Sequence, residues 1–294
     1  MKILKRIAAA FIIGTMVFSV AGCKDDNTKE LVNENSAENN ELSADEIFAN
    51  LSNNIKSVKS YNAIMNVEGS LDSGDYTSNV GAKSEIDFIS EPLYIKKILS
   101  LDDGTGTIQN IETYIKEDGE SIDIYNNAGG QWTHQRKSSD QTDSVVELED
   151  IKSDIEYIIE NIQDVVIADK NIDGKTKLEG TIPTEKIADV VNNIDAFTYI
   201  GLSGYSAESY DNAEPLKVAL YVDSETGNIT EISCDLQKTL QTLIDNTMAS
   251  FPDGSNVPKL TATKYNVSIT LSNYNSVSET EIPEDALRTE AFGS

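Results

Sequence analysis

The chain has 294 residues, with 50 Asp and Glu against 23 Lys and Arg, so its formal net charge is −27. Such an acidic chain repels nucleic acid and anionic lipid headgroups, which argues against both as partners. Hydrophobic residues make up 39% of the chain, which is enough for a folded core.

The first 22 residues have the three parts of a secretory signal. Three basic residues open the segment, an apolar run follows over residues 7–20, and small residues precede Cys23. The apolar run is shorter than the ~20 residues that a membrane-spanning helix needs. We therefore expect a signal peptide over residues 1–22 and no transmembrane segment.

The sequence Val20-Ala21-Gly22-Cys23 resembles the lipobox of bacterial lipoproteins. The resemblance implies that the chain is cut before Cys23 and that Cys23 carries acyl chains such as palmitate. These chains would anchor the protein to the outer face of the cell membrane, an extracytoplasmic location. Residues 23–41 are polar and lack aromatic side chains, so we expect a disordered tether. The alternative is an ordinary cleaved signal in which Cys23 has no role.

Ordered structure is expected from residue 42, beginning with a helix and an antiparallel meander. Ser43 and Glu46 have the spacing of a capping box, and apolar residues then recur at helical spacing to residue 59. From Tyr61 the period changes to two, which predicts strands. These strands are expected over residues 61–71, 77–89, 94–101, 108–116, 121–125 and 131–136.

The second half of the chain mixes helical and strand periods. It predicts helices over 143–161, 184–194 and 236–248, and the last of these ends before a turn at 251–254. Strands are expected over 218–222, 229–234 and 265–271, with a hairpin turn at Asp173-Gly174. We also expect a loop over 197–210 and a terminal clasp over 282–286.

This order of elements predicts an α+β fold in which a curved antiparallel sheet forms a half-barrel covered by a few short helices. The layout resembles the LolA/LppX-like lipoprotein carriers, with an unclosed barrel, and their Gram-positive relatives of unknown function. The resemblance rests on the Ser60-Tyr61 entry to the first strand, the run over 178–183, the hairpin over 220–228, and Glu281-Ile282-Pro283. It implies a single domain over residues 42–294.

Residues that would support catalysis or metal binding are scarce. His134 is the only histidine, and the sequence places no cysteine or acidic residue beside it. No Gly-x-Ser-x-Gly motif is present, so we expect no catalytic triad and no enzyme activity. One histidine and the unlipidated Cys234 are too few soft ligands for a structural zinc site, and we expect no metal and no cofactor. Cys234 is expected to be a small buried hydrophobic residue.

Two functions remain open. The first is a non-enzymatic, membrane-anchored lipoprotein whose half-barrel cavity binds a lipid or other hydrophobic ligand, with Trp132, Tyr199, Tyr205 and Ile269 as candidate cavity-lining residues. The alternative for these aromatic residues is ordinary packing in a core or loop. The second function is an interaction lipoprotein that senses or supports an envelope protein, such as a cell-wall enzyme or a signalling protein.

Overall fold

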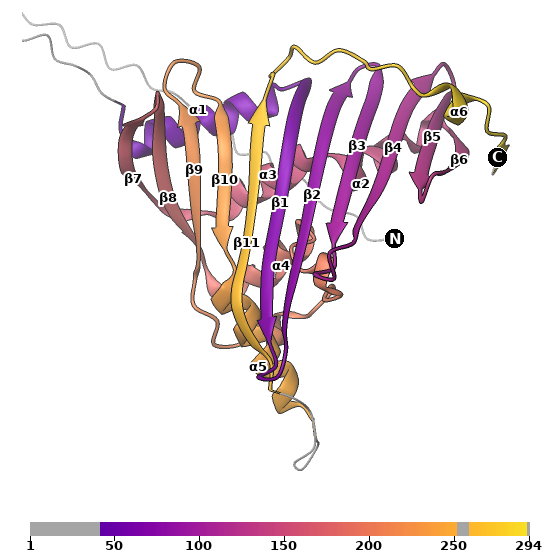
Figure 1. Ribbon diagram of the computed structural model, residues 1–294. Helices are drawn as coiled ribbons and strands as arrows, with labels where there is room; N and C mark the ends of the chain where they lie inside the picture. The colour runs from indigo at the N-terminus through magenta and orange to yellow at the C-terminus, as the bar shows by residue number, and fades with distance from the viewer. Residues whose placement is uncertain (1–41, 252–258, 293–294) are drawn as a thin grey trace, which may run out of the picture. The chain divides into compact units, whose positions relative to one another are not determined.

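The computed structural model describes residues 42–251 and 259–292 (Figure 1), and these described residues form one compact unit. The expected signal peptide, Cys23 and the tether lie outside the described residues, as does most of the turn expected at 251–254. Among the described residues, no helix is both long enough and apolar enough to cross a membrane.

The described strands form one 12-stranded sheet in the order β12-β6-β5-β4-β3-β2-β1-β11-β10-β9-β8-β7. Every pairing is antiparallel except the one between β12 and β6. The strands are β1 (Ser60–Asp72), β2 (Thr77–Ser90), β3 (Leu93–Asp102), β4 (Ile108–Asp118), β5 (Ser121–Ala128), β6 (Gln131–Ser138), β7 (Gln163–Ile172), β8 (Lys175–Ile182), β9 (Leu216–Asp223), β10 (Ile229–Asp235), β11 (Thr261–Ser272) and β12 (Ala291–Phe292).

The sheet is curved, and its two end strands, β12 and β7, do not pair with each other. The expected α+β half-barrel is therefore confirmed. The expected meander is also confirmed, because β1 to β6 pair in sequence order. The sequence did not predict the pairing of β1 with β11, in which Met65 lies opposite Ile269 and joins the meander to the later strands.

The helices lie on one face of the sheet, behind it in Figure 1, and we call this the inner face. They are α1 (Ala44–Lys56), α2 (Thr142–Glu149), α3 (Ile151–Asn161), α4 (Thr184–Asn193) and α5 (Gln237–Ala249); the short α6 (Glu284–Leu287) lies near β5 and β6 instead. The expected capping box starts α1, since the Ser43 amide donates to Glu46 Oε2 at 2.8 Å and the Glu46 amide donates to Ser43 Oγ at 3.3 Å.

The single helix expected over residues 143–161 is wrong, because the chain breaks into α2 and α3 at Asp150. The Asp150 backbone is extended there, and its carboxylate accepts from the Lys152 amide at 3.0 Å and caps α3. The same carboxylate accepts from the Tyr61 hydroxyl at 2.8 Å. A contact with β1 thus fixes the break. The expected loop over 197–210 also contains two 3₁₀ turns, η2 (Thr198–Ile200) and η3 (Ala207–Tyr210).

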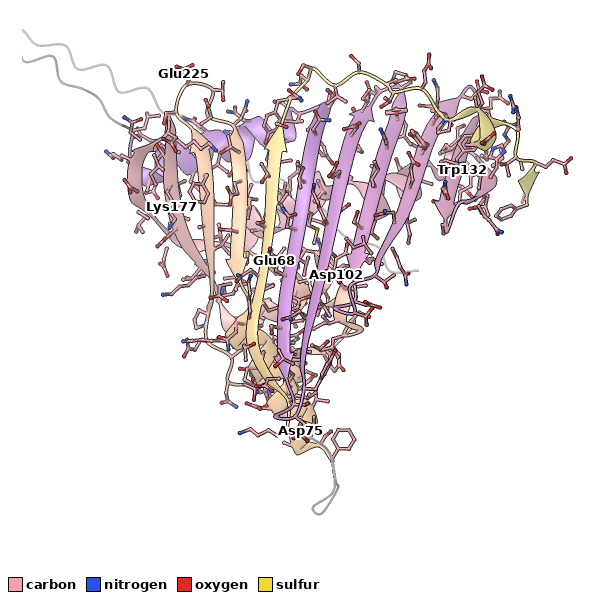
Figure 2. All side chains as sticks on the ribbon, viewed as in Figure 1. Glu68, Asp75, Asp102, Trp132, Lys177 and Glu225 are labelled. Carbon is pink, nitrogen blue, oxygen red and sulfur yellow. The ribbon has the colours of Figure 1, made fainter. Side chains whose placement is uncertain are left out.

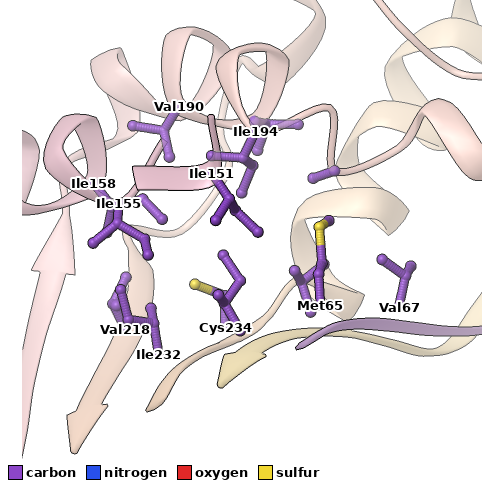
Figure 3. Packing of buried hydrophobic residues seen from close by; sticks show 14 of the residues in the cluster. Met65, Val67, Ile151, Ile155, Ile158, Val190, Ile194, Val218, Ile232 and Cys234 are labelled. Atoms are coloured by element: carbon purple, nitrogen blue, oxygen red, sulfur yellow. The ribbon is translucent and has the colours of Figure 1, made fainter. Parts of the chain in front are cut away.

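One hydrophobic core joins the sheet to the helices. Ile155 on α3 and Val190 on α4 are fully buried, and they belong to the same core as Val218 and Ile232 from the sheet (Figure 3). Cys234 lies among them and is 5% exposed, and burial raises the pKa of its thiol to about 12. A thiol in this state is a packing residue, as the sequence indicated.

Candidate functional site

The helices do not cover the inner face evenly. Over β9, β10 and β11, inner-facing side chains are almost completely buried: Leu220 is 0% exposed, Ile232 is 1% and Ile269 is 2%. On β3 and β4, the inner-facing Leu99 and Ile111 lie opposite each other and both remain partly exposed. The helices' own apolar side chains therefore fill the inner face over the later strands and cover it less completely around Leu99 and Ile111. Ile95 and Ile115, on the same face of β3 and β4, are buried.

We call the less covered region the inner patch. Its members share the inner face by strand register and are partly exposed: Lys97, Leu99, Leu101, Ile111, Thr113 and Asn126. The patch has an apolar part, formed by Leu99, Leu101 and Ile111, and a polar part. In the polar part the Thr113 hydroxyl donates to Asn126 Oδ1 at 2.8 Å. Apolar surface with a few placed polar groups is typical of sites for small amphiphilic ligands.

A buried hydroxyl borders the inner patch. Ser84 on β2 lies opposite Leu99 and also opposite Met65, so its side chain faces inward. Ser84 is 3% exposed, and its Oγ has no hydrogen-bond partner. A buried polar atom without a partner costs about 1–3 kcal/mol.

The carboxylate of Asp154, in the first turn of α3, is coupled electrostatically to Lys97 in the inner patch. The pKa of Asp154 is raised from 3.8 to about 7. Burial is the main cause, the charges of Asp150 and Asp195 add to it, and Lys97 opposes it. The Asn193 amide donates to the Asp154 carboxylate at 3.3 Å. The side chain therefore changes its charge near neutral pH, next to the inner patch.

Replacing Asp154 by Asn should stabilise the protein above neutral pH. Because the folded state raises this pKa, the stabilisation from Asp154 is complete below about pH 4 and is lost as the pH rises through 7. At about pH 8 the variant should be more stable than the wild type by roughly 1–3 kcal/mol, with little difference at about pH 4. Urea unfolding at both pH values measures this. The exposed Asp75→Asn is the control and should show no such difference; equal pH dependence in wild type and D154N would contradict the prediction.

The four candidate cavity residues do not come together. Tyr199 and Tyr205 are partly buried and pack against the main core, with Tyr199 in η2, which contacts β2 beside β3. Ile269 lies deep in that core. Trp132 lies on the opposite, outer face of the sheet, in a separate cluster with Tyr94, Tyr114, Tyr125 and Ala286.

The position of Trp132 corrects the expectation that it lines the half-barrel. Strand register places it on the same face as Asn127 and Glu112, which is the face away from the main core. Glu68 and Asp102 lie on this outer face too, and Figure 2 shows Trp132 toward the β6 end of the sheet. The ring of Trp132 packs on Tyr114, with centroids 6.1 Å apart, so Trp132 cannot contact a ligand on the inner face.

The expectation that His134 lacks an acidic partner is wrong. The β5–β6 hairpin brings Asp123 to it, and His134 Nε2 lies 2.8 Å from Asp123 Oδ1. Arg136 also binds this carboxylate, with Nε at 2.7 Å and Nη2 at 2.9 Å. Alternating positions on the two arms of the hairpin, around the Gly129-Gly130 turn, are the sequence signal that could have found this cluster.

Two other features carry no site. Within residues 42–251 and 259–292, no three His, Cys, Asp or Glu side chains lie together as a metal site requires. A pocket of about 640 Å³ lies between β4, β5 and the chain near α6, and is lined mostly by charged side chains, including Lys116, Asp118 and Glu279.

The comparisons with known proteins assign no activity. Residues 43–173 match a family of unknown function, DUF6612, and this match covers α1, the first six strands and the inner patch. No curated protein matches the chain. Among solved structures, a DUF1329 family protein from Desulfovibrio piger is similar at 12% identity and a TM-score of 0.23, covering 81% of this chain and 95% of that chain.

Proposed function

We propose that this protein binds a lipid or other hydrophobic ligand on the inner face of its half-barrel, at the inner patch. The observation that supports the proposal is the contrast in coverage: Leu99, Leu101 and Ile111 are partly exposed, whereas equivalent side chains on the later strands are buried. Burial of apolar surface provides about 25 cal/mol per Å², so an acyl chain on these three residues would be bound without any covalent step. The protein would act by binding and not by catalysis.

The polar groups around the patch fit the other end of such a ligand. The Thr113–Asn126 pair lies on the inner face beside Ile111 and is partly exposed, so it can meet a headgroup. An amphiphile with a hydrogen-bonding headgroup and an apolar chain would satisfy both parts. The proposed site is smaller than the cavity expected from sequence, because apolar side chains of the helices fill the inner face over β9, β10 and β11.

Titration with a fluorescent long-chain fatty acid tests the binding proposal. Residues 24–294, exported behind a cleavable secretory signal, retain every described residue and avoid competition from the anchor and from detergent. We expect saturable binding with one site per chain, and displacement by unlabelled acyl lipid. No saturation, or a signal that matches that of a protein without a ligand site, would reject the proposal.

We further propose that acyl chains on Cys23 hold the protein at the outer face of the membrane. Growth with an alkyne fatty acid should label the wild type, and Cys23→Ser should lose the label and leave the membrane fraction. Cys234→Ser is the matched control, because the chain has only these two cysteines and Cys234 is buried. Labelling that survives in C23S would contradict the anchor.

A second candidate function is protein interaction through the β7 edge. β7 pairs only with β8 among the described strands, and Val166 on it is 55% exposed. An edge strand with an exposed apolar side chain can accept a strand from an envelope protein. Val166→Lys should then abolish capture of that partner from membranes and leave fatty-acid binding unchanged; capture unaffected by V166K would count against this edge.

A further inference from the structure

The C-terminal segment runs along one end of the sheet and is tied to residues of its outer face. This strap, which we define as residues 273–292, runs along the ends of β1 to β5 and reaches α6 near β5 and β6 (Figure 1). The Tyr94 hydroxyl donates to the Thr280 carbonyl and accepts from the Thr280 amide, both at 3.1 Å. Ala286 is 0% exposed and packs in the aromatic cluster that contains Tyr94 and Trp132. The strap thus covers aromatic surface that would otherwise face solvent.

His134 joins the end of the strap to the sheet. Its Nδ1 lies 3.1 Å from the carbonyl oxygen of Thr289, while its Nε2 lies 2.8 Å from Asp123 Oδ1. His134 is 6% exposed and Asp123 is 5% exposed, so water does not compete strongly for these bonds. The next residues of the strap, β12, pair with β6 and place Ala291 opposite His134.

The partners determine which atoms of the ring carry hydrogen. Burial raises the pKa of Asp123, but the hydrogen bonds from Arg136 and His134 outweigh it and the pKa is lowered. Asp123 is therefore ionised, and its oxygens can only accept. The Thr289 carbonyl also can only accept. Both contacts are hydrogen bonds only when both ring nitrogens donate, and a histidine that donates from both is the imidazolium cation.

We propose that His134 is a protonation-dependent latch for the C-terminal strap. The imidazolium holds Asp123 and the Thr289 carbonyl together. Neutral imidazole has one N–H, and it keeps this proton toward the charged Asp123, because a bond to an ionised acceptor is the stronger one. The lone pair of Nδ1 then faces the Thr289 carbonyl, and the end of the strap loses this bond, whereas the contacts of Tyr94 with Thr280 do not depend on the charge of His134.

The groups around the ring include one ionised acceptor, Asp123, toward which neutral His134 would keep its proton. From β5, Asp123 and Tyr125 face His134, and the rings of Tyr125 and His134 stack with centroids 4.3 Å apart. From the same strand as His134, Arg136 donates to both oxygens of Asp123. On α6, Glu284 and Asp285 are exposed and pair with Arg288.

The direction of the pH effect follows from the two bonds. The folded state makes one more bond to the charged ring than to the neutral one, so the strap is held at low pH and released as the pH rises. Histidine side chains in general lose their proton between about pH 5 and 8. Release would uncover the aromatic cluster around Trp132.

Two residues that occur only once make the test direct. His134 is the only histidine and Trp132 the only tryptophan, so ring nitrogen NMR shifts and tryptophan emission each report a single site. In the full chain in detergent micelles, we expect both ring nitrogens to be protonated at about pH 5. From about pH 5 to about pH 9, hydrogen exchange of the amides in 286–292, corrected for its intrinsic pH dependence, should rise about tenfold, and Trp132 emission should shift to the red.

His134→Gln is the control, because its amide does not titrate in this range. Its strap exchange and its Trp132 emission should not change between the two pH values. A neutral ring in the wild type at about pH 5 would overturn the latch, whether or not the variant folds. The same pH-dependent exchange in wild type and H134Q would also overturn it.

Discussion

Replacing Ile155 by Ala should lower the free energy of unfolding by about 2–5 kcal/mol. Ile155 lies on α3, is 0% exposed, and packs in the core between the helices and the sheet (Figure 3). The smaller side chain leaves a cavity that helices resting on a rigid sheet cannot close. Urea unfolding followed by circular dichroism measures the change.

The control for this prediction is Leu287→Ala in α6. Leu287 is 56% exposed, so its truncation should change the free energy of unfolding by no more than about 0.5 kcal/mol. If I155A were as mild as L287A, α3 would not be packed against the sheet, and the inner face would be far less filled than described above.

Leu99→Asp should weaken fatty-acid binding at least tenfold, or by about 1.4 kcal/mol. Leu99 faces inward on β3 and is partly exposed, so a carboxylate there would meet the apolar chain of the ligand and lose its water on binding. The titration described above measures the loss. Because the position is only partly buried, we expect the variant to fold.

The neighbouring residue offers a matched control. Ile98 is also partly exposed and apolar, but adjacent residues of a strand point to opposite faces, so Ile98 lies on the outer face. Ile98→Asp should leave binding within about twofold of the wild type, at a similar cost in stability. Equal losses in L99D and I98D would place the ligand somewhere other than the inner patch.

Local patterns in the sequence predict the local structure of this protein well. The Ser43–Glu46 capping box and the alternation from Tyr61 through Val67 each depend on side chains a few residues apart, and both are present as expected. The Asp173-Gly174 turn joins β7 to β8 for the same reason. Most strand and helix bounds could therefore be predicted within a few residues.

Contacts between distant segments could not be predicted in this way. The break at Asp150 is fixed by the hydroxyl of Tyr61, 89 residues earlier in the chain. β1 pairs with β11 across most of the chain, and no local period specifies that register. Residues on both faces of β6 are largely polar, so alternation alone did not reveal that Trp132 and His134 face outward.

The candidate site shows the same limit. The aromatic residues chosen from sequence lie on different faces, whereas the apolar part of the inner patch consists of ordinary aliphatic residues on β3 and β4. What distinguishes Leu99 from Ile269 is how completely the helices cover each of them. That coverage depends on where α2 and α3 pack, which the sequence pattern does not specify.

Native mass spectrometry of residues 24–294, followed by organic extraction, tests the central claim most directly. We predict that the exported protein carries one acyl lipid per chain, that L99D loses it and that I98D retains it. A wild-type protein whose mass is that of the polypeptide alone, and that stays so after incubation with membrane lipids, would contradict the account and favour the β7 edge as the functional surface.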